Sequence, residues 1–241
     1  TITAVGMNAL APVSKNGKLT LAGDKGFAGF KTGEYTVRRP EDRTRAMGDR
    51  SLDNVAAGRK ATRGMTLADA CNRSVSSLKK SCAGAGLIVV HGREIDDAGG
   101  ANVGAASFET LLRQIRAAAN NLRSAGIGTF VFTADHGFLL NDHTVRAIPF
   151  GAKTDPDARY VLSDEPRSEA ETTRVSLKAL GYEGREGYLL FPRDTAVFAT
   201  ARRSDAFVHG GNSIQERVIP VLTVAHRSAA LSGAGRYAVS V

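Results

Sequence analysis

The chain of 241 residues is long enough to bury a core, and its 42% hydrophobic and 23% charged residues are ordinary for a soluble globular protein. It has no apolar stretch of membrane-spanning length and only two cysteines, Cys71 and Cys82, which argues against a membrane protein or a disulfide framework and favours a cytoplasmic location. The net charge of +8 favours an anionic partner or substrate, nucleic acid foremost, although the absence of Trp and the few Tyr and Phe argue against a base-stacking surface.

The first twelve residues begin with the hydroxyls of Thr1 and Thr3 and stop at Pro12. Because the chain starts with Thr rather than Met, we expect a fragment or an excised domain. The pattern predicts a short helix from about Ala4 to Leu10, with Thr3 near its N-cap. Thr3 is either that cap alone or a hydroxyl held beside a helix N-terminus, where backbone N–H groups also bind a phosphate oxygen.

Residues 18–63 have a different character: two short predicted strands, KLTLAG and GEYTVRR, lead into a basic run. We expect either a mobile basic loop or a small inserted subdomain here. The arginines form either a solvated surface or a surface that contacts the phosphates of nucleic acid. The candidate phosphate contacts are Arg38, Arg39, Arg43 and Arg45.

The middle of the chain predicts two strands and two helices. Helical spacing marks residues 66–82 and, most clearly, residues 107–126. On either side of the second helix, Leu87–Val90 and Thr129–Thr133 are uncharged runs typical of strands buried on both faces. The order strand, helix, strand predicts a right-handed crossover unit with parallel strands.

Acidic and imidazole side chains follow both predicted strands. Asp135 and His136 come directly after the second strand, and open α/β sheets bind their ligands at the carboxyl ends of strands. The alternative is that Asp135 caps a turn and His136 is an ordinary loop histidine. The first strand is followed by His91, Asp96 and Asp97.

A glycine-rich loop near the end of the chain supplies one more imidazole. His209 precedes Gly210 and Gly211, and a short helical turn follows. Ser213 and Glu216 have the spacing of a capping box at the start of that turn.

The candidate ligands come from separate parts of the sequence; they are Thr3, Asp96, Asp135, His136 and His209. Carboxylates and imidazoles without a thiolate suit zinc, manganese or a related divalent ion at a hydrolytic centre. Two such ions held close together are a known solution for displacement at phosphorus.

The segments TITAVGM, EIDDAGG, VFTADHGF and HGGNSIQERVIPV together resemble the PglZ domain, a branch of the alkaline phosphatase superfamily. PglZ domains occur in bacterial phage-defence systems of the BREX type and in some response regulators. The resemblance spans Thr1 to about Val221, and its two best motifs are specific in this order and spacing. It implies an α/β, three-layer, alkaline-phosphatase-like fold over residues 1–241, with a mostly parallel central sheet and the basic segment 18–63 as a small insertion.

The resemblance also implies a role for each candidate. Thr3 matches the nucleophile, which touches one metal, and Asp135 and His136 match the ligands of that metal. His209 and Asp96 match ligands of the other metal. Weaker candidates, as ligands or as residues that support ligands, are Asp97, Thr1 and His91.

The chain departs from the superfamily pattern at two points. An aspartate expected at the end of a first strand, before the nucleophile, lies upstream of Thr1. Gly100 stands where the superfamily has another ligand, four residues after Asp96, and glycine has no side chain to coordinate with. An inactive or single-metal version is therefore an open alternative, with Asp97 as a partial substitute.

The implied function is that of a metal-dependent phosphoesterase, most simply a phosphodiesterase or nuclease, in phage defence or signalling. It would use one or two zinc ions, or manganese, and take a phosphoester such as a nucleic acid or oligonucleotide. Other phage-defence proteins are candidate partners, and no membrane is. One alternative is a non-catalytic scaffold that binds partner proteins or DNA; another is a general nucleic-acid-binding domain.

Overall fold

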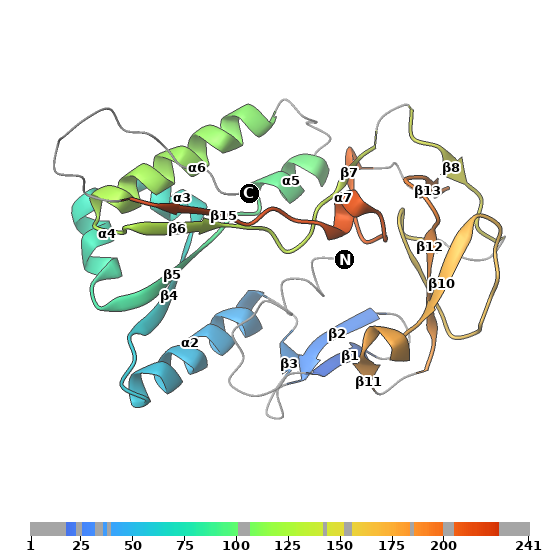
Figure 1. The fold of residues 1–241 in the computed structure, drawn as a ribbon, viewed down its shortest axis with the longest axis horizontal. Helices are drawn as coiled ribbons and strands as arrows, with labels where there is room; N and C mark the ends of the chain where they lie inside the picture. Colours follow the sequence, from blue (N-terminus) through green and yellow to red (C-terminus); the bar gives the residue numbers. More distant parts are fainter. Residues whose placement is uncertain are drawn as a thin grey trace.

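The computed structural model contains both helices and strands, with most helices in the first half of the chain, and this mixed content fits the predicted α/β class (Figure 1). The structure describes residues 18–22, 26–31, 36–37, 40–100, 107–141, 144–151, 156–183, 186–199 and 205–226. Thr1, Thr3, the predicted helix near Ala4 and the two arginines Arg38 and Arg39 lie outside these residues. Within the described part, no helix combines the length and the apolar character that a membrane crossing requires.

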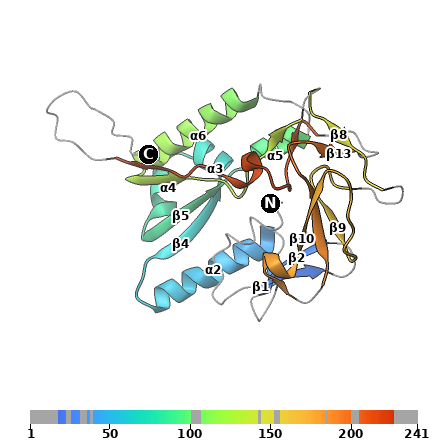
Figure 2. The same ribbon diagram turned by 45° about the vertical axis from the view of Figure 1, so that its right-hand side comes forward.

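One part of the molecule is built from two strand pairs and the helices that cover them. Its strands are β4 (Ala61–Thr66), β5 (Ala85–His91), β6 (Thr129–Phe132) and β15 (Leu222–Ala225). Its helices are α2 (Pro40–Ala56), α3 (Leu67–Asn72), α4 (Val75–Cys82), α5 (Glu94–Gly100) and α6 (Ser107–Ser124). Helices α6 and α2 lie on opposite sides of the strands in both views (Figure 2).

The strand pairing differs from the predicted crossover sheet. β4 and β5 are parallel, whereas β6 runs antiparallel to β15, with Phe132 opposite Leu222. No continuous, mostly parallel sheet is therefore formed by the strands that the structure describes. The three-layer fold with such a sheet stays a prediction.

The two predicted strands are also less buried than expected. Val131 is 60% exposed and Leu87 is 56% exposed, whereas Phe130 and Val90 pack against the core. Burial on both faces was therefore the wrong interpretation, because an uncharged β-branched run forms a half-buried strand equally well. The core on the covered face gathers Met65, Leu67, Leu78, Leu111 and Leu122.

The predicted helix over 66–82 is two helices, because two separate N-caps interrupt it. The Thr66 hydroxyl accepts from the Asp69 N–H at 3.0 Å and begins α3, while the Ser74 hydroxyl accepts from the Ser77 N–H at 3.3 Å and begins α4. The predicted helix from Ser107 is confirmed as α6.

Residues 18–63 contain more regular structure than a mobile loop. β1 (Lys18–Ala22), β2 (Gly26–Lys31) and β3 (Thr36–Val37) form an antiparallel meander. β11 (Tyr182–Glu183) adds to this meander alongside β1. Much of the basic run is helix α2, which buries Ala46 and Met47 toward β4.

The other part of the molecule is rich in short strands, most of which lie to the right of α7 in Figure 1. Its elements are β7 (Leu139–Leu140), β8 (Ala147–Ile148), β9 (Val161–Ser163), β10 (Thr172–Ser176), η2 (Lys178–Leu180), β12 (Tyr188–Pro192), β13 (Val197–Phe198), β14 (Phe207–Val208) and α7 (Ile214–Arg217). β12 is the centre of a three-stranded antiparallel sheet, and β13 pairs with β8 in parallel. A second core of Ile148, Phe150, Val161, Leu190 and Phe198 fills this part.

Candidate active site

The loop after β6 presents a carboxylate and an imidazole side by side. His136 is only 8% exposed, and its Nδ1 lies 3.0 Å from the carbonyl oxygen of Gly137. Since a carbonyl oxygen only accepts hydrogen bonds, this contact places the proton of a neutral imidazole on Nδ1. Nε2 then keeps a lone pair, and it lies 3.4 Å from Oδ2 of Asp135.

The separation of Asp135 and His136 would accommodate either a proton or a shared cation between them. Oδ2 of Asp135 is buried and accepts no hydrogen bond within the described part of the chain. Two lone pairs that face each other repel unless a proton or a cation lies between them. Two ligand atoms bound to one tetrahedral zinc at ~2.0–2.1 Å are themselves about 3.4 Å apart. The observed separation fits this arrangement.

His209 reaches the same place from a distant part of the sequence. It follows β14, which pairs antiparallel with β7, and Val208 lies opposite Leu139. Because β7 begins shortly after the Asp135 loop, this pairing carries His209 to that loop. The His136 and His209 rings stack with centroids 4.1 Å apart and an angle of 18° between their planes. The structure therefore brings His209 close to Asp135 and His136, whereas their roles as metal ligands stay a prediction.

The rings of Phe108, Phe138 and Phe207 pack against one another and connect α6, the segment before β7 and β14. This cluster was not predicted from the sequence. Phe138 lies 4.9 Å from Phe207 between ring centroids, and Phe108 at the start of α6 lies 5.3 Å from Phe207. Part of the signal was present, since Phe108 lies at the start of the predicted helix 107–126 and Phe138 follows the predicted strand Thr129–Thr133, whereas no predicted element contained Phe207. Only the β7–β14 pairing shows that they meet.

Position 137 must be a glycine because the backbone of Gln215 lies too close for a side chain. A Cβ at Gly137 would lie 1.9 Å from the backbone oxygen of Gln215, far inside van der Waals contact. The Gly137 N–H donates to the carbonyl of Glu216 at 3.0 Å. Helix α7 therefore packs directly on the backbone of the Asp135 loop.

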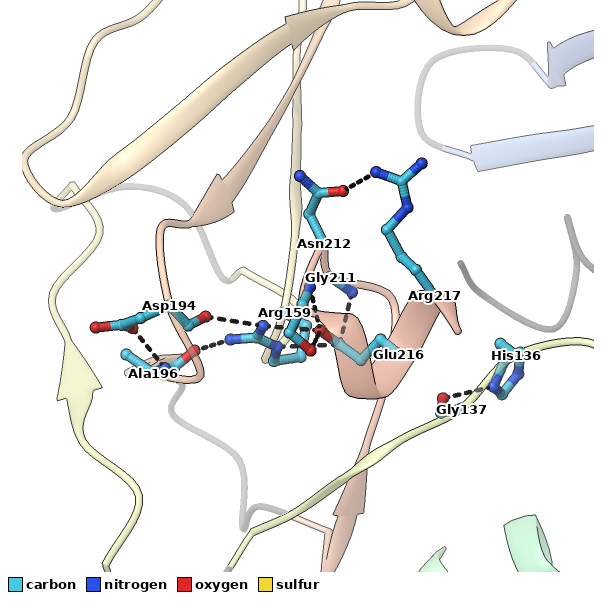
Figure 3. A network of polar contacts seen from close by, with 10 residues as sticks. His136, Gly137, Arg159, Asp194, Ala196, Gly211, Asn212, Glu216 and Arg217 are labelled. Atoms are coloured by element: carbon cyan, nitrogen blue, oxygen red, sulfur yellow. Dashed lines mark hydrogen bonds and ion pairs between the residues drawn. The ribbon is translucent and has the colours of Figure 1, made fainter. Parts of the chain in front are cut away.

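The predicted capping box at α7 is confirmed, and its glutamate has a further partner. The Glu216 carboxylate accepts from the Ser213 N–H at 3.1 Å and from the Ser213 hydroxyl at 2.7 Å. It also forms a two-point ion pair with Arg159, which the sequence analysis did not single out (Figure 3). No local signal marks Arg159, because its partner lies 57 residues further along the chain.

The structure does not show any of the other predicted ligands at the Asp135–His136–His209 cluster. Asp96 lies in α5, but its side chain is outside the described part. Asp97 is 67% exposed at its side chain and faces Arg93 at 3.8 Å. His91 ends β5 and is half-buried; burial lowers its pKa, and the charge of Arg43 lowers it further.

Of the two predicted phosphate contacts that the structure describes, Arg43 and Arg45, Arg43 lies within electrostatic reach of Asp135. It lies in the first turns of α2, and burial lowers its pKa. The charge of Asp135 acts in the opposite direction and raises that pKa, whereas Arg93 lowers it. Arg43 is thus within electrostatic reach of both Asp135 and a second arginine, while Arg45 is exposed on α2.

The carboxylate and the two imidazoles are suitable ligands for a divalent metal ion, but they do not form a complete set of ligands around one ion. Among the described residues, no group of three or more His, Cys, Asp or Glu side chains is arranged to hold a metal ion. Asp135 and His136 have suitable spacing, whereas His209 stacks on His136. Any further protein ligands would come from the side chains of Thr3 and Asp96, which lie outside the described part.

Comparison with known proteins gives two matches. A family model described as the BREX system PglZ alkaline phosphatase-like domain matches residues 1–224. A curated protein of Bacillus cereus (strain H3081.97), "Alkaline phosphatase-like protein PglZ", is 33% identical over 122 residues. That alignment covers 48% of this chain and 14% of the relative, so the chain spans a small part of the relative's length. The resemblance that the sequence motifs indicated is confirmed.

Proposed function

We propose, because this chain belongs to the PglZ family of alkaline phosphatase-like domains, that it is a metal-dependent phosphoesterase. The observation that carries the proposal is the Asp135–His136 pair, in which a buried carboxylate oxygen faces Nε2 at 3.4 Å. His209 supports it as a second imidazole beside the pair, because its ring lies 4.1 Å from that of His136 between centroids and imidazoles are common ligands of hydrolytic metal ions.

Zinc, or manganese as the alternative, would be held by Asp135 and His136, with Asp96 and His209 as ligands of a second ion. When bound, such an ion lowers the pKa of a hydroxyl or water and offsets charge on the phosphoryl oxygens. The Gly137 carbonyl fixes the tautomer of His136, so that Nε2 is directed toward Asp135.

Thr3 would act as the nucleophile. Its hydroxyl oxygen would form a bond to phosphorus as the bond from phosphorus to the leaving oxygen breaks. The hydroxyl proton would pass to water, and the leaving oxygen would take up a proton from water and depart as an alcohol. A water molecule then displaces Thr3 from phosphorus and releases phosphate or a phosphomonoester. Arg43 would bind a non-bridging oxygen, since a guanidinium pairs well with phosphate.

We favour a phosphodiester as the substrate, which includes nucleic acid and oligonucleotides. The net charge of +8 attracts a polyanion, and Arg43 is a positive charge within electrostatic reach of Asp135. A role beside other phage-defence proteins is the corresponding biological proposal.

The test is hydrolysis of a chromogenic phosphodiester with added zinc or manganese. We expect Thr3→Ala and Asp135→Ala each to lower kcat/KM by at least about a hundredfold, because each removes a group that acts on the reacting phosphorus or its metal. Asp53→Ala, an exposed aspartate of α2, is the matched control and should keep the wild-type rate. Equal rates for all four proteins would exclude the mechanism.

A non-catalytic scaffold is the second candidate, favoured by the incomplete ligand set and by Gly100 at an expected ligand position. Elemental analysis of the purified protein separates the two, because the enzyme retains zinc or manganese and the scaffold retains neither. A general nucleic-acid-binding domain is distinguished by DNA binding that weakens with salt and survives the loss of Asp135 and His136.

A further inference from the structure

We propose that Arg159 and Glu216 are positioning residues, whose buried ion pair fixes the loop Asp135–Gly137 against the loop His209–Gly211. The proposal that this matters for metal binding rests on the function proposed above. The structural part, that the pair holds both loops, stands independently of that function.

The pair is completely removed from solvent. Arg159 and Glu216 are both 0% exposed. Nε of Arg159 donates to Oε1 at 3.0 Å, and Nη2 donates to Oε2 at 2.8 Å. The same guanidinium donates to the carbonyl oxygens of Asp194 and Ala196, so it joins α7 to the turn between β12 and β13.

Glu216 contacts both loops of the candidate site through different atoms. Its Oε1 accepts from the Gly211 N–H at 2.8 Å, two residues after His209. Its backbone carbonyl accepts from the Gly137 N–H at 3.0 Å, one residue after His136. One residue therefore spans the two segments whose imidazoles stack at 4.1 Å.

The packing around the pair leaves little freedom for the His209 loop. A Cβ at Gly211 would lie 2.7 Å from Oε2 of Glu216 and 2.8 Å from Nε of Arg159. Figure 3 shows the guanidinium between Gly211 and the Asp194–Ala196 turn, with Glu216 beside it. The position of Gly211, and with it that of His209, is thus set by the pair.

A buried ion pair of this kind is not explained by stability alone. Removing two charges from water is unfavourable, and apolar residues of similar volume often serve stability equally well. What apolar residues cannot supply is a set of directed hydrogen bonds to two loops. The geometry therefore points to positioning as the role of the pair.

The first readout is amide hydrogen exchange, which needs neither metal nor activity. We expect Arg159→Met to speed exchange in peptides covering 135–138 and 207–213 by about tenfold, as a charge-assisted hydrogen bond is lost. Peptides from α6 should exchange at the wild-type rate. Leu78→Ala, a cavity variant in the other core, is the control and should affect α4 and α6 but not these loops.

The second readout is zinc affinity, measured by calorimetry without substrate. We expect Arg159→Met to weaken zinc binding by about 10–100-fold, the effect usual for a residue that supports a ligand, while Leu78→Ala leaves it unchanged. If the wild-type protein binds no zinc, the function proposed above is excluded. The hydrogen-exchange result would still decide whether the ion pair positions the two loops.

Unchanged exchange in both loops of a folded Arg159→Met protein would overturn the proposal. If this variant does not fold, Glu216→Gln and the double variant Arg159→Met/Glu216→Gln are judged by the same criterion. The double variant leaves neither charge buried without its partner.

Discussion

At the residue scale, the backbone atoms of Gly137 determine how the Asp135 loop packs against helix α7. The Gly137 N–H and carbonyl are both engaged, one with Glu216 and the other with His136. The missing side chain of Gly137 admits the Gln215 carbonyl. A glycine in the Asp-His-Gly motif is therefore a packing requirement here, and its backbone connects the imidazole to helix α7.

We predict that Gly137→Ala destabilises the protein by about 1–3 kcal/mol, because a methyl group forced into a filled space displaces the backbone around it. Urea unfolding followed by circular dichroism measures the change. Gly48→Ala is the matched control: it lies inside α2, and an added Cβ would have no atom within 4 Å beyond its chain neighbours and the backbone of its own helix. Since alanine favours a helix over glycine, the control should be stabilised by up to about 1 kcal/mol. Equal effects of both substitutions would contradict the packing explanation.

At the scale of elements, some short-range signals were interpreted correctly and others were missed. The bounds of α6 and the Ser213–Glu216 capping box follow from spacing within one turn or one helix. β4, with the sequence ATRGMT, carries no apolar alternation and was missed. The split between α3 and α4 depends on Ser74, whose capping role was hidden inside a continuous helical pattern.

The Thr66 cap gives a prediction at this scale. Thr66→Ala removes the acceptor for the Asp69 N–H and the hydrogen bond that the Thr66 hydroxyl donates to the Asp69 carboxylate. We expect a loss of about 1 kcal/mol in the free energy of unfolding, typical of a lost N-cap. Thermal unfolding of both variants measures the change. Thr110→Ala, at an exposed position within α6, is the control, and its free energy of unfolding should stay within about 0.5 kcal/mol of the wild-type value. If Thr66→Ala unfolds with the wild-type midpoint, the cap does not stabilise α3.

At the scale of the whole molecule, the site depends on contacts between distant segments. Sequence spacing placed Asp135, His136 and His209 at element ends, and the β7–β14 pairing brings them together. Arg159 was not predictable, because a buried ion pair with a residue 57 positions away leaves no periodic trace. The antiparallel β6–β15 pair was missed for the same reason, since strand partners are chosen by tertiary packing.

The charges that join distant segments also predict how stability depends on pH. Hydrogen bonds from the Thr66 hydroxyl and then the Thr66 backbone N–H lower the pKa of Asp69. The Ala196 N–H, followed by Arg146, lowers the pKa of Asp194. Burial raises the pKa of Glu216, but the hydrogen bonds from Arg159 and Ser213 outweigh it, and the pKa is lowered overall. All three carboxyls thus hold their protons less tightly in the folded protein than in the unfolded chain.

A lowered pKa contributes stability that is fully present above the ordinary values of 3.8 for Asp and 4.5 for Glu. That contribution is lost as the pH falls through the folded-state pKa, because the unfolded chain binds protons first. We therefore expect the urea midpoint to be constant between about pH 7 and pH 5 and to fall steeply toward about pH 3. Glu216→Gln should have a lower midpoint at neutral pH and a shallower fall, so that the two curves converge in acid. Curves that stay parallel over this range would show that Glu216 is not the carboxylate on which acid stability depends.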